Sequence, residues 1–431
     1  IALKLQPGIA GALTRDFRII MFTGTNGKTT TTRIIGQILK ESGVDFITNI
    51  SGANLVSGIV TTFLDSSDIL GRFKAQTALI EVDEAAFNTA VNLIEPDLLV
   101  VTNFFRDQLD RYGELYTTLK GVQTGIRKVQ KLKLVLNADD SLCASLGNAY
   151  DREVSYYGMD RSAYNSAEKV VNTDAMFCIY CKTKYEYTNQ VYGHLGGFSC
   201  PGCGYSRPET DVTCEKIIKL TSSGSDIVLR TSGPRSTSFT ASVNLPGIYN
   251  IYNALAASAC GFMLGLPPEN ILRALGSFEC GFGRMETIHT DGRIIKVILV
   301  KNPTGFNQVL DFLLTEEKDT QVAFLINDKL ADGTDISWLW DVDFEKLQRM
   351  QHRVGCFYTS GIRAEDMAVR LKYAGLDTCK LDIIKDYDKL INTGIEKTNP
   401  GQCFYILPTY TAMLDIRKIL KNKYSLKEFW K

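Results

Sequence analysis

A glycine-rich stretch near the start of the chain has the composition of a phosphate-binding loop. It follows an apolar run from Phe17 to Phe22 and precedes a helical pattern from Thr29 to Glu41. Glycines let the backbone wrap a phosphate, a helix N-terminus points its amides at the anion, and a lysine adds positive charge. A glycine-rich turn without a ligand is the alternative, but the flanking strand and helix favour a phosphate loop. The residues expected at the phosphates are Gly24, Thr25, Asn26, Gly27, Lys28, Thr29 and Thr30.

A carboxylate lies near the end of the next buried strand candidate, Ala78 to Val82. Magnesium at a phosphate loop is bound by the loop's threonine hydroxyl and by a second oxygen ligand, usually a carboxylate. Glu81 stands near the C-terminal end of its strand, where open α/β sheets collect their ligands. An acidic cluster in this position is by itself usually a solvated turn. Next to a phosphate loop, it predicts a magnesium site formed by Thr29 and Glu81.

Four cysteines form two C-x-x-C pairs separated by eighteen residues, and the chain has eleven cysteines in all. Two such pairs can complete a tetrahedral site of four thiolates, which leaves no open position and is therefore structural. Two disulfides, a redox pair and chance are the alternatives. The spacing favours structural zinc, bound by Cys178, Cys181, Cys200 and Cys203.

The elements around these residues predict an α/β protein with an insertion. Short apolar strands alternate with helical patterns in the first half, which indicates a doubly wound, mostly parallel sheet. The rhythm breaks in a stretch rich in Cys, Gly and Tyr, and a second boundary follows near Arg284. We expect an ATP-binding domain over residues 1–284, a zinc-ribbon insertion over 172–211 and a smaller Rossmann-like α/β domain over 285–431.

Four motifs in this order resemble the Mur ligase superfamily, which includes the muropeptide ligases and folylpolyglutamate synthase. Gly24–Thr31 is similar to its shortened phosphate loop. Val101–Asn103 followed by Asp107–Tyr112 is similar to its second nucleotide and metal segment. Leu245–Ala257 resembles its adenine-side helix, and Gly283–Glu286 resembles its domain-junction motif.

The resemblance implies further roles for single residues. Asn250 and Asn253 would contact the nucleotide, and Arg284 would meet its phosphates. Asn302 stands where relatives often carry an aspartate for the ribose, and an amide can still hydrogen-bond a hydroxyl. Gln108 stands where the family often has a histidine that helps to hold a second magnesium ion.

Within the superfamily, the four cysteines and an Asp-rich loop resemble the ligase subunits that amidate lipid II. Fewer than 25 residues precede the glycine stretch, so a UDP-binding domain is not expected. The resemblance implies amidation of the D-glutamate α-carboxylate of the lipid II stem peptide. Ammonia would come from a class I glutamine amidotransferase in a heterodimer. Asp335, ahead of Asp332 and Asp341, would face the catalytic histidine of that partner.

These residues suit ATP-dependent activation of a carboxylate. Attack on the γ-phosphate gives an acyl phosphate, and ammonia then displaces the phosphate. Lys28, together with Arg284 and the magnesium ligands, would stabilise the transferring group. No side-chain nucleophile is required. His194 lies inside the cysteine-rich insertion, while His289 and His352 lack neighbouring motifs. We expect all three histidines to be structural or at the surface.

Composition limits the alternatives. The 48 basic and 48 acidic residues cancel, which argues against a nucleic-acid binder. No apolar run is long enough to cross a bilayer, so a cytoplasmic protein that meets lipid II at the inner face of the plasma membrane is expected. A stand-alone ligase on a soluble substrate, like folylpolyglutamate synthase, is the main alternative. A non-catalytic scaffold with a degenerate nucleotide site is disfavoured by intact Lys28, Thr29, Glu81 and Arg284.

Overall fold

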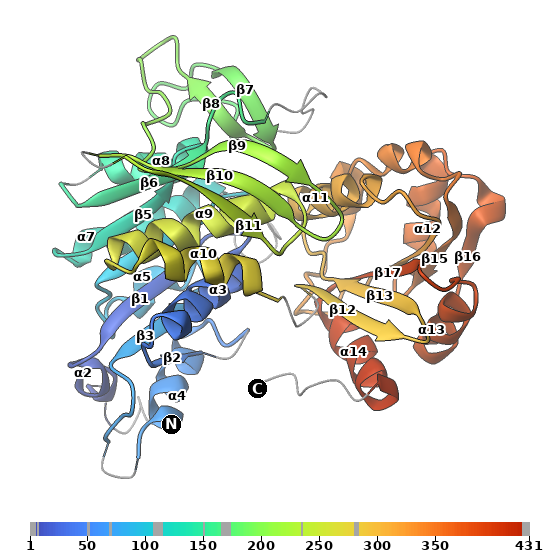
Figure 1. The fold of residues 1–431 in the computed structure, drawn as a ribbon, viewed down its shortest axis with the longest axis horizontal. Helices are drawn as coiled ribbons and strands as arrows, with labels where there is room; N and C mark the ends of the chain where they lie inside the picture. The colour runs from blue at the N-terminus through green and yellow to red at the C-terminus, as the bar shows by residue number, and fades with distance from the viewer. Residues whose placement is uncertain are drawn as a thin grey trace. The chain divides into compact units, whose positions relative to one another are not determined.

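The computed structural model describes residues 6, 8–49, 52–68, 71–106, 115–149, 151–164, 174–233, 236–279 and 284–424. The chain forms two compact units. Among the described residues, the first comprises residues up to Phe105 and from Leu115 to Phe278, and the second comprises Arg106 and the residues from Glu279 onward. Each unit is a sheet with helices packed on it (Figure 1).

The first unit is built on a sheet that has nine strands in the described part of the chain, in the order β11-β10-β9-β6-β5-β4-β1-β3-β2. The strands from β9 to β2 run parallel, whereas β9, β10 and β11 pair antiparallel. A mostly parallel α/β sheet is thus confirmed, while the antiparallel edge was not predicted. The strands are β1 (Arg18–Thr23), β2 (Phe46–Thr48), β3 (Thr77–Glu81), β4 (Leu98–Val101), β5 (Lys133–Asn137), β6 (Val154–Met159), β9 (Val212–Leu220), β10 (Ser225–Thr231) and β11 (Ser238–Val243).

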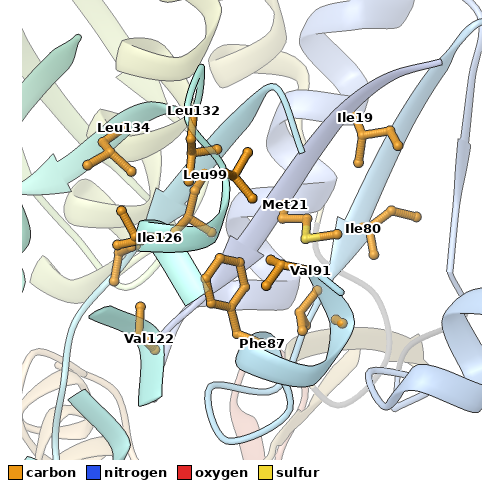
Figure 2. Packing of buried hydrophobic residues seen from close by; sticks show 14 of the residues in the cluster. Ile19, Met21, Ile80, Phe87, Val91, Leu99, Val122, Ile126, Leu132 and Leu134 are labelled. Carbon is orange, nitrogen blue, oxygen red and sulfur yellow. The ribbon is translucent and has the colours of Figure 1, made fainter. Parts of the chain in front are cut away.

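Helices cover both faces of this sheet. On one face, alternate strand residues such as Met21, Ile80 and Leu99 pack against Phe87 of α5 and Val122 of α7 (Figure 2). On the other face, α3, α9 and α10 pack together over the strands. The helices of the unit are α2 (Ile9–Thr14), α3 (Lys28–Glu41), α4 (Val56–Ser66), α5 (Phe87–Ala90), α7 (Leu115–Lys128), α8 (Ser141–Asn148), α9 (Ile248–Met263) and α10 (Pro268–Ser277).

The chain between β6 and β9 contains the four cysteines, and we call residues 174–211 the cysteine segment. It forms a two-stranded antiparallel hairpin of β7 (Glu186–Tyr192) and β8 (Leu195–Ser199). Buried aromatic residues and two of the cysteines form a small core of its own beside Ala144 of α8. This agrees with the expectation that the alternation of strands and helices is interrupted here.

The second unit is a six-stranded sheet of order β12-β13-β17-β14-β15-β16. Only β12 and β13 pair antiparallel among the described strands of this sheet. A second α/β unit is therefore confirmed. Its strands are β12 (Arg284–Thr290), β13 (Arg293–Ile298), β14 (Thr320–Leu325), β15 (Val354–Ser360), β16 (Leu381–Ile383) and β17 (Cys403–Pro408). Its helices are α11 (Pro303–Leu314), η1 (Ser337–Asp341), η2 (Phe344–Arg349), α12 (Ala364–Tyr373), η3 (Thr378–Lys380), α13 (Tyr387–Glu396) and α14 (Tyr410–Tyr424).

None of the described helices is long and apolar enough to span a bilayer.

Candidate nucleotide site and four-cysteine cluster

Two glycines shape the turn between β1 and α3, which we call the glycine loop (Gly24–Gly27). Gly24 has φ 119° and Gly27 has φ 88°, a region that side chains other than glycine rarely adopt. A Cβ atom on Gly24 would lie 2.4 Å from the Thr102 hydroxyl, and one on Gly27 would lie 2.2 Å from Asn253 Oδ1. Both positions therefore require glycine, and the loop is pressed between two other segments of the first unit.

The first of these segments, Thr102–Phe105, follows β4 and fixes the loop by hydrogen bonds. The Thr102 hydroxyl donates to the Asn26 carbonyl at 2.7 Å. The side chain of Asn103 accepts from the Asn26 amide at 2.9 Å and donates to the Asn26 carbonyl at 3.0 Å. One amide side chain therefore satisfies both backbone groups of Asn26 and fixes the conformation of the loop at this residue.

Lys28 lies at the start of α3 with its ammonium turned back onto the loop. Nζ donates to the carbonyls of Gly24 and Thr25 and forms a buried ion pair of 2.8 Å with Glu84 Oε2. Burial disfavours the charged form, but the carboxylates of Glu84 and Asp83 outweigh it and raise the pKa of Lys28. The side chain is therefore a fixed positive charge at the loop.

Thr29 and Glu81, the predicted magnesium ligands, lie together. The Thr29 hydroxyl donates to Glu81 Oε2 at 2.8 Å, and both side chains are buried. β3 pairs directly with β1, so Glu81 at its end lies opposite Phe22, just before the loop. A hydroxyl and a carboxylate oxygen are hard ligands, so this donor set fits a magnesium ion.

The second segment that presses on the loop is the start of α9, where the predicted residues Asn250 and Asn253 are also found. Both are buried and joined by a 2.9 Å hydrogen bond from Asn253 Nδ2 to Asn250 Oδ1. Asn253 Oδ1 accepts from the Thr31 hydroxyl of α3 at 3.4 Å. Asn253 therefore lies beside Gly27, whereas Asn250 binds the Pro246 carbonyl at 2.7 Å.

The structure brings only part of the predicted nucleotide site together. Gln108 and the side chain of Arg284 lie outside the described residues. Asn302 belongs to the second unit, where its buried side chain caps α11 by accepting from the Gly305 amide at 2.8 Å. The sequence did not predict this cap, although Asn followed by Pro is a common helix start.

The four cysteines predicted to bind metal form one cluster, with all sulfur atoms within 4.8 Å of one another. Sγ of Cys178 lies 3.6 Å from that of Cys203, and Sγ of Cys181 lies 3.3 Å from that of Cys200. These distances are too long for disulfides, whose S–S bond is about 2.05 Å. Hydrogen bonding to Thr183 lowers the pKa of Cys181 to about 6. The cluster has the ligand number and the spacing of a site that could hold a metal ion.

The three candidate aspartates of the Asp-rich loop after β14 differ in burial. Asp332 is buried and accepts hydrogen bonds from the Thr411 amide and hydroxyl. Asp335 is exposed, and its carboxylate accepts from the Ser337 amide at 2.8 Å and hydroxyl at 2.9 Å. Asp341 is also exposed. Asp332 therefore stabilises the loop, while Asp335 presents a carboxylate held in one place at the surface.

Comparison with known proteins gives the family. A family model of the Mur ligase middle domain matches residues 22–198, and one described as MurT ligase C-terminal matches residues 299–413. The MurT subunit of lipid II isoglutaminyl synthase (glutamine-hydrolyzing) from Streptococcus pneumoniae is 34% identical over 423 residues, which cover 98% of this chain and 91% of that protein.

The chain belongs to the MurT family. The MurT subunit from Staphylococcus aureus is 31% identical over 433 residues and covers similar shares of both chains, 98% and 92%. Among solved structures, a pseudomurein peptide ligase type C from Methanothermus fervidus superposes with a TM-score of 0.67 at 22% identity. It covers 94% of this MurT-family chain and 79% of its own, and shows the shared fold.

The roles of three residues at the site of this MurT-family chain were not predicted. Glu84 lies in the acidic cluster that includes Glu81, but its ion pair with Lys28 was not predicted. Thr102 and Asn103 belong to a motif that the sequence indicated, but their hydrogen bonds to Asn26 were not predicted. The only signal for Glu84 was its position three residues after Glu81, just beyond a strand end.

Proposed function

We propose that this chain is the ligase subunit of a lipid II isoglutaminyl synthase. It uses ATP to amidate the D-glutamate α-carboxylate of the lipid II stem peptide, with ammonia supplied by a class I glutamine amidotransferase subunit. The observation that carries this proposal is the convergence of Lys28, Thr29 and Glu81 at the glycine loop. Similarity to MurT subunits over 98% of the chain supports the choice of substrate and partner.

The chemistry follows from the groups at the loop. The carboxylate oxygen attacks the γ-phosphorus, the bond to the ADP oxygen breaks, and an acyl phosphate forms. Ammonia then adds to the acyl carbon, phosphate leaves, and a proton is lost to give the amide. Lys28 neutralises charge on the phosphates, and the loop amides bind them.

Thr29 and Glu81 would hold magnesium, which supplies charge neutralisation between the phosphates. Gly24 to Thr30 would bind the phosphates, with Asn250, Asn253, Arg284 and Asn302 as the further nucleotide candidates. The four cysteines would hold a structural zinc ion that closes a ribbon inserted in the ATP-binding domain. We also propose the domain limits 1–284, 172–211 and 285–431. A lipid-linked substrate would be met in the cytoplasm, at the inner face of the plasma membrane.

The test uses the purified full-length chain with lipid II, ATP and magnesium. Ammonium should support amidation, whereas glutamine should do so only after the amidotransferase subunit is added. Lys28→Ala and Glu81→Ala should each lower ammonium-dependent turnover at least about a hundredfold, as expected when a charge-stabilising group is removed.

Lys40→Ala, which changes an exposed lysine of the same helix, is the matched control and should stay near the starting activity. Turnover close to normal in both site variants would disprove the assignment of the loop. Efficient use of glutamine by the lone chain would disprove the two-subunit model.

A further inference from the structure

The tip of the β7–β8 hairpin, Tyr192–His194, packs against Phe105. The Tyr192 ring stacks on the Phe105 ring with centroids 5.8 Å apart, and the His194 ring lies 4.8 Å away. Gly193 between them has φ 54°, and a Cβ atom there would lie 2.7 Å from Phe105 Cε1. The cysteine segment, whose hairpin is labelled in Figure 1, thus packs directly on the segment after β4.

Phe105 in turn fixes Thr25 of the glycine loop. The Phe105 amide donates to the Thr25 hydroxyl at 3.1 Å, and that hydroxyl donates to the Phe105 carbonyl at 3.2 Å. The Thr25 amide donates to the Asn103 carbonyl at 2.9 Å. Phe105 therefore contacts both the tip of the hairpin and the loop expected to bind phosphates.

A second connection runs through two fully buried side chains. His194 Nε2 lies 3.1 Å from Asp140 Oδ1, and Asp140 Oδ2 accepts from the Phe104 amide at 2.7 Å. Burial alone would lower the pKa of His194, but the Asp140 carboxylate outweighs it and raises this pKa. Asp140 also caps α8 by accepting from the amides of Leu142 and Cys143. The hairpin tip is thus connected to the Phe104 backbone by hydrogen bonds through Asp140, and it also packs on the ring of Phe105.

We propose that the tip of the β7–β8 hairpin positions the glycine loop for nucleotide binding, by setting the backbone of Phe104 and Phe105. The four-cysteine cluster then supports a hairpin that acts on the ligase site, in addition to stabilising the cysteine segment. The inference rests on the proposed function, because it takes the loop to be the phosphate site. Tyr192, Gly193 and His194 are positioning residues, since their contacts reach the loop only through other residues.

The test compares two glycine substitutions in the same segment. Gly193→Ala adds a methyl group that displaces the Phe105 ring. Gly204→Ala adds one at φ 77° with no atom within 4 Å, so it reproduces the backbone strain without the contact. The dissociation constant for Mg·ADP should rise about fivefold or more in Gly193→Ala and less than about twofold in Gly204→Ala. The reason is that a small displacement of the groups that bind a ligand weakens binding and slows the reaction steeply.

Metal content, melting temperature and the KM for ATP are measured on the same samples. For Gly193→Ala we expect unchanged metal content and a KM raised more than kcat is lowered. If Gly193→Ala does not fold, Tyr192→Leu replaces it, because it removes the stacked ring without adding an atom. The same direction of change is expected.

A rescue experiment isolates the contact. In a Phe105→Leu background the smaller side chain leaves room for the added methyl group, so Gly193→Ala should no longer weaken Mg·ADP binding. A Gly193→Ala effect that persists there, or an equal effect of Gly204→Ala at unchanged metal content, would overturn the inference. Lys28→Ala serves as the reference. If Lys28→Ala leaves Mg·ADP binding unchanged, the proposed function itself fails.

Discussion

The ammonium of Lys28 is surrounded by oxygen atoms of the protein, from Glu84 and from the carbonyls of Gly24 and Thr25. A nucleotide phosphate that binds the loop must compete with these acceptors for the same charge. Glu84 therefore has two effects. It keeps Lys28 ionised, and it offers a negative charge that opposes the arrival of a phosphate.

The first prediction concerns the pH dependence set by this pair. A raised pKa keeps Lys28 charged beyond its ordinary value of 10.5, so Mg·ADP affinity should not fall through loss of this charge between pH 7 and about pH 10. In Glu84→Gln, burial still disfavours the charge while the largest favourable contribution is gone. The pKa of Lys28 should then fall, and affinity should decline from a lower pH as the lysine loses its proton.

Titration of Mg·ADP across this range by calorimetry measures the effect. At pH 7 the variant should bind at least as tightly as the unmodified chain, because a repelling carboxylate is removed. Glu95→Gln, at an exposed position of the same unit, should leave the profile unchanged. Parallel profiles for the unmodified chain and Glu84→Gln would contradict the role given to Glu84.

The cysteine segment shows what one element adds to the site. Its β7–β8 hairpin packs on Phe105 at the tip, and a small core of aromatic residues and two of the cysteines lies at its other end. Such a small core stabilises a segment only weakly, so a metal cross-link would supply a large part of the stability.

The second prediction concerns this cross-link. Elemental analysis should find one zinc per chain, and Cys178→Ser should lower both the zinc content and the melting temperature, because a thiolate ligand is lost. Cys379→Ser is the matched control, since Cys379 is exposed and lies outside the cluster. Folded, fully active protein without zinc would show that the four thiols have another role.

Elements set by local pattern could be predicted from the sequence. β1, the glycine loop and α3 follow from an apolar strand, two glycines and a helical period, and the cysteine spacing indicated the cluster. The contact of Thr29 with Glu81 was predicted, because ligands of open α/β sheets collect at strand ends. Other contacts between distant segments could not be predicted, because periodicity carries no information about which loops meet. The contacts that were not predicted include the Lys28–Glu84 ion pair, the hydrogen bond between Asn103 and Asn26, and the packing of Gly193 on Phe105.

At the scale of the whole molecule, the chain carries the glycine loop in one unit and an Asp-rich loop in the other. The exposed carboxylate of Asp335 is oriented by Ser337, which suits a group that contacts another protein. Buried Asp332 has its hydrogen bonds within the unit. The two aspartates should therefore respond differently to the same change.

The third prediction uses this difference. Asp335→Asn should lower glutamine-dependent amidation by the two-subunit complex at least about tenfold, while ammonium-dependent amidation stays within about twofold, if this carboxylate orients a catalytic histidine of the partner. Both rates are measured with lipid II and ATP at saturating concentrations. Asp332→Asn should instead lower the melting temperature, because it weakens the bonds to Thr411. Equal loss of both nitrogen sources in Asp335→Asn would place the aspartate in the ligase reaction.

The position of the cysteine segment between β6 and β9 has a consequence for how the chain folds. These strands are parallel neighbours, yet about fifty residues separate them along the chain. Closing so long a connection costs entropy, and the cost falls when part of the connection is already cross-linked. Chains that bind metal early should therefore complete the β9–β11 edge sooner during refolding. The open edge of β6, an unpaired strand that invites association between chains, would be exposed for a shorter time.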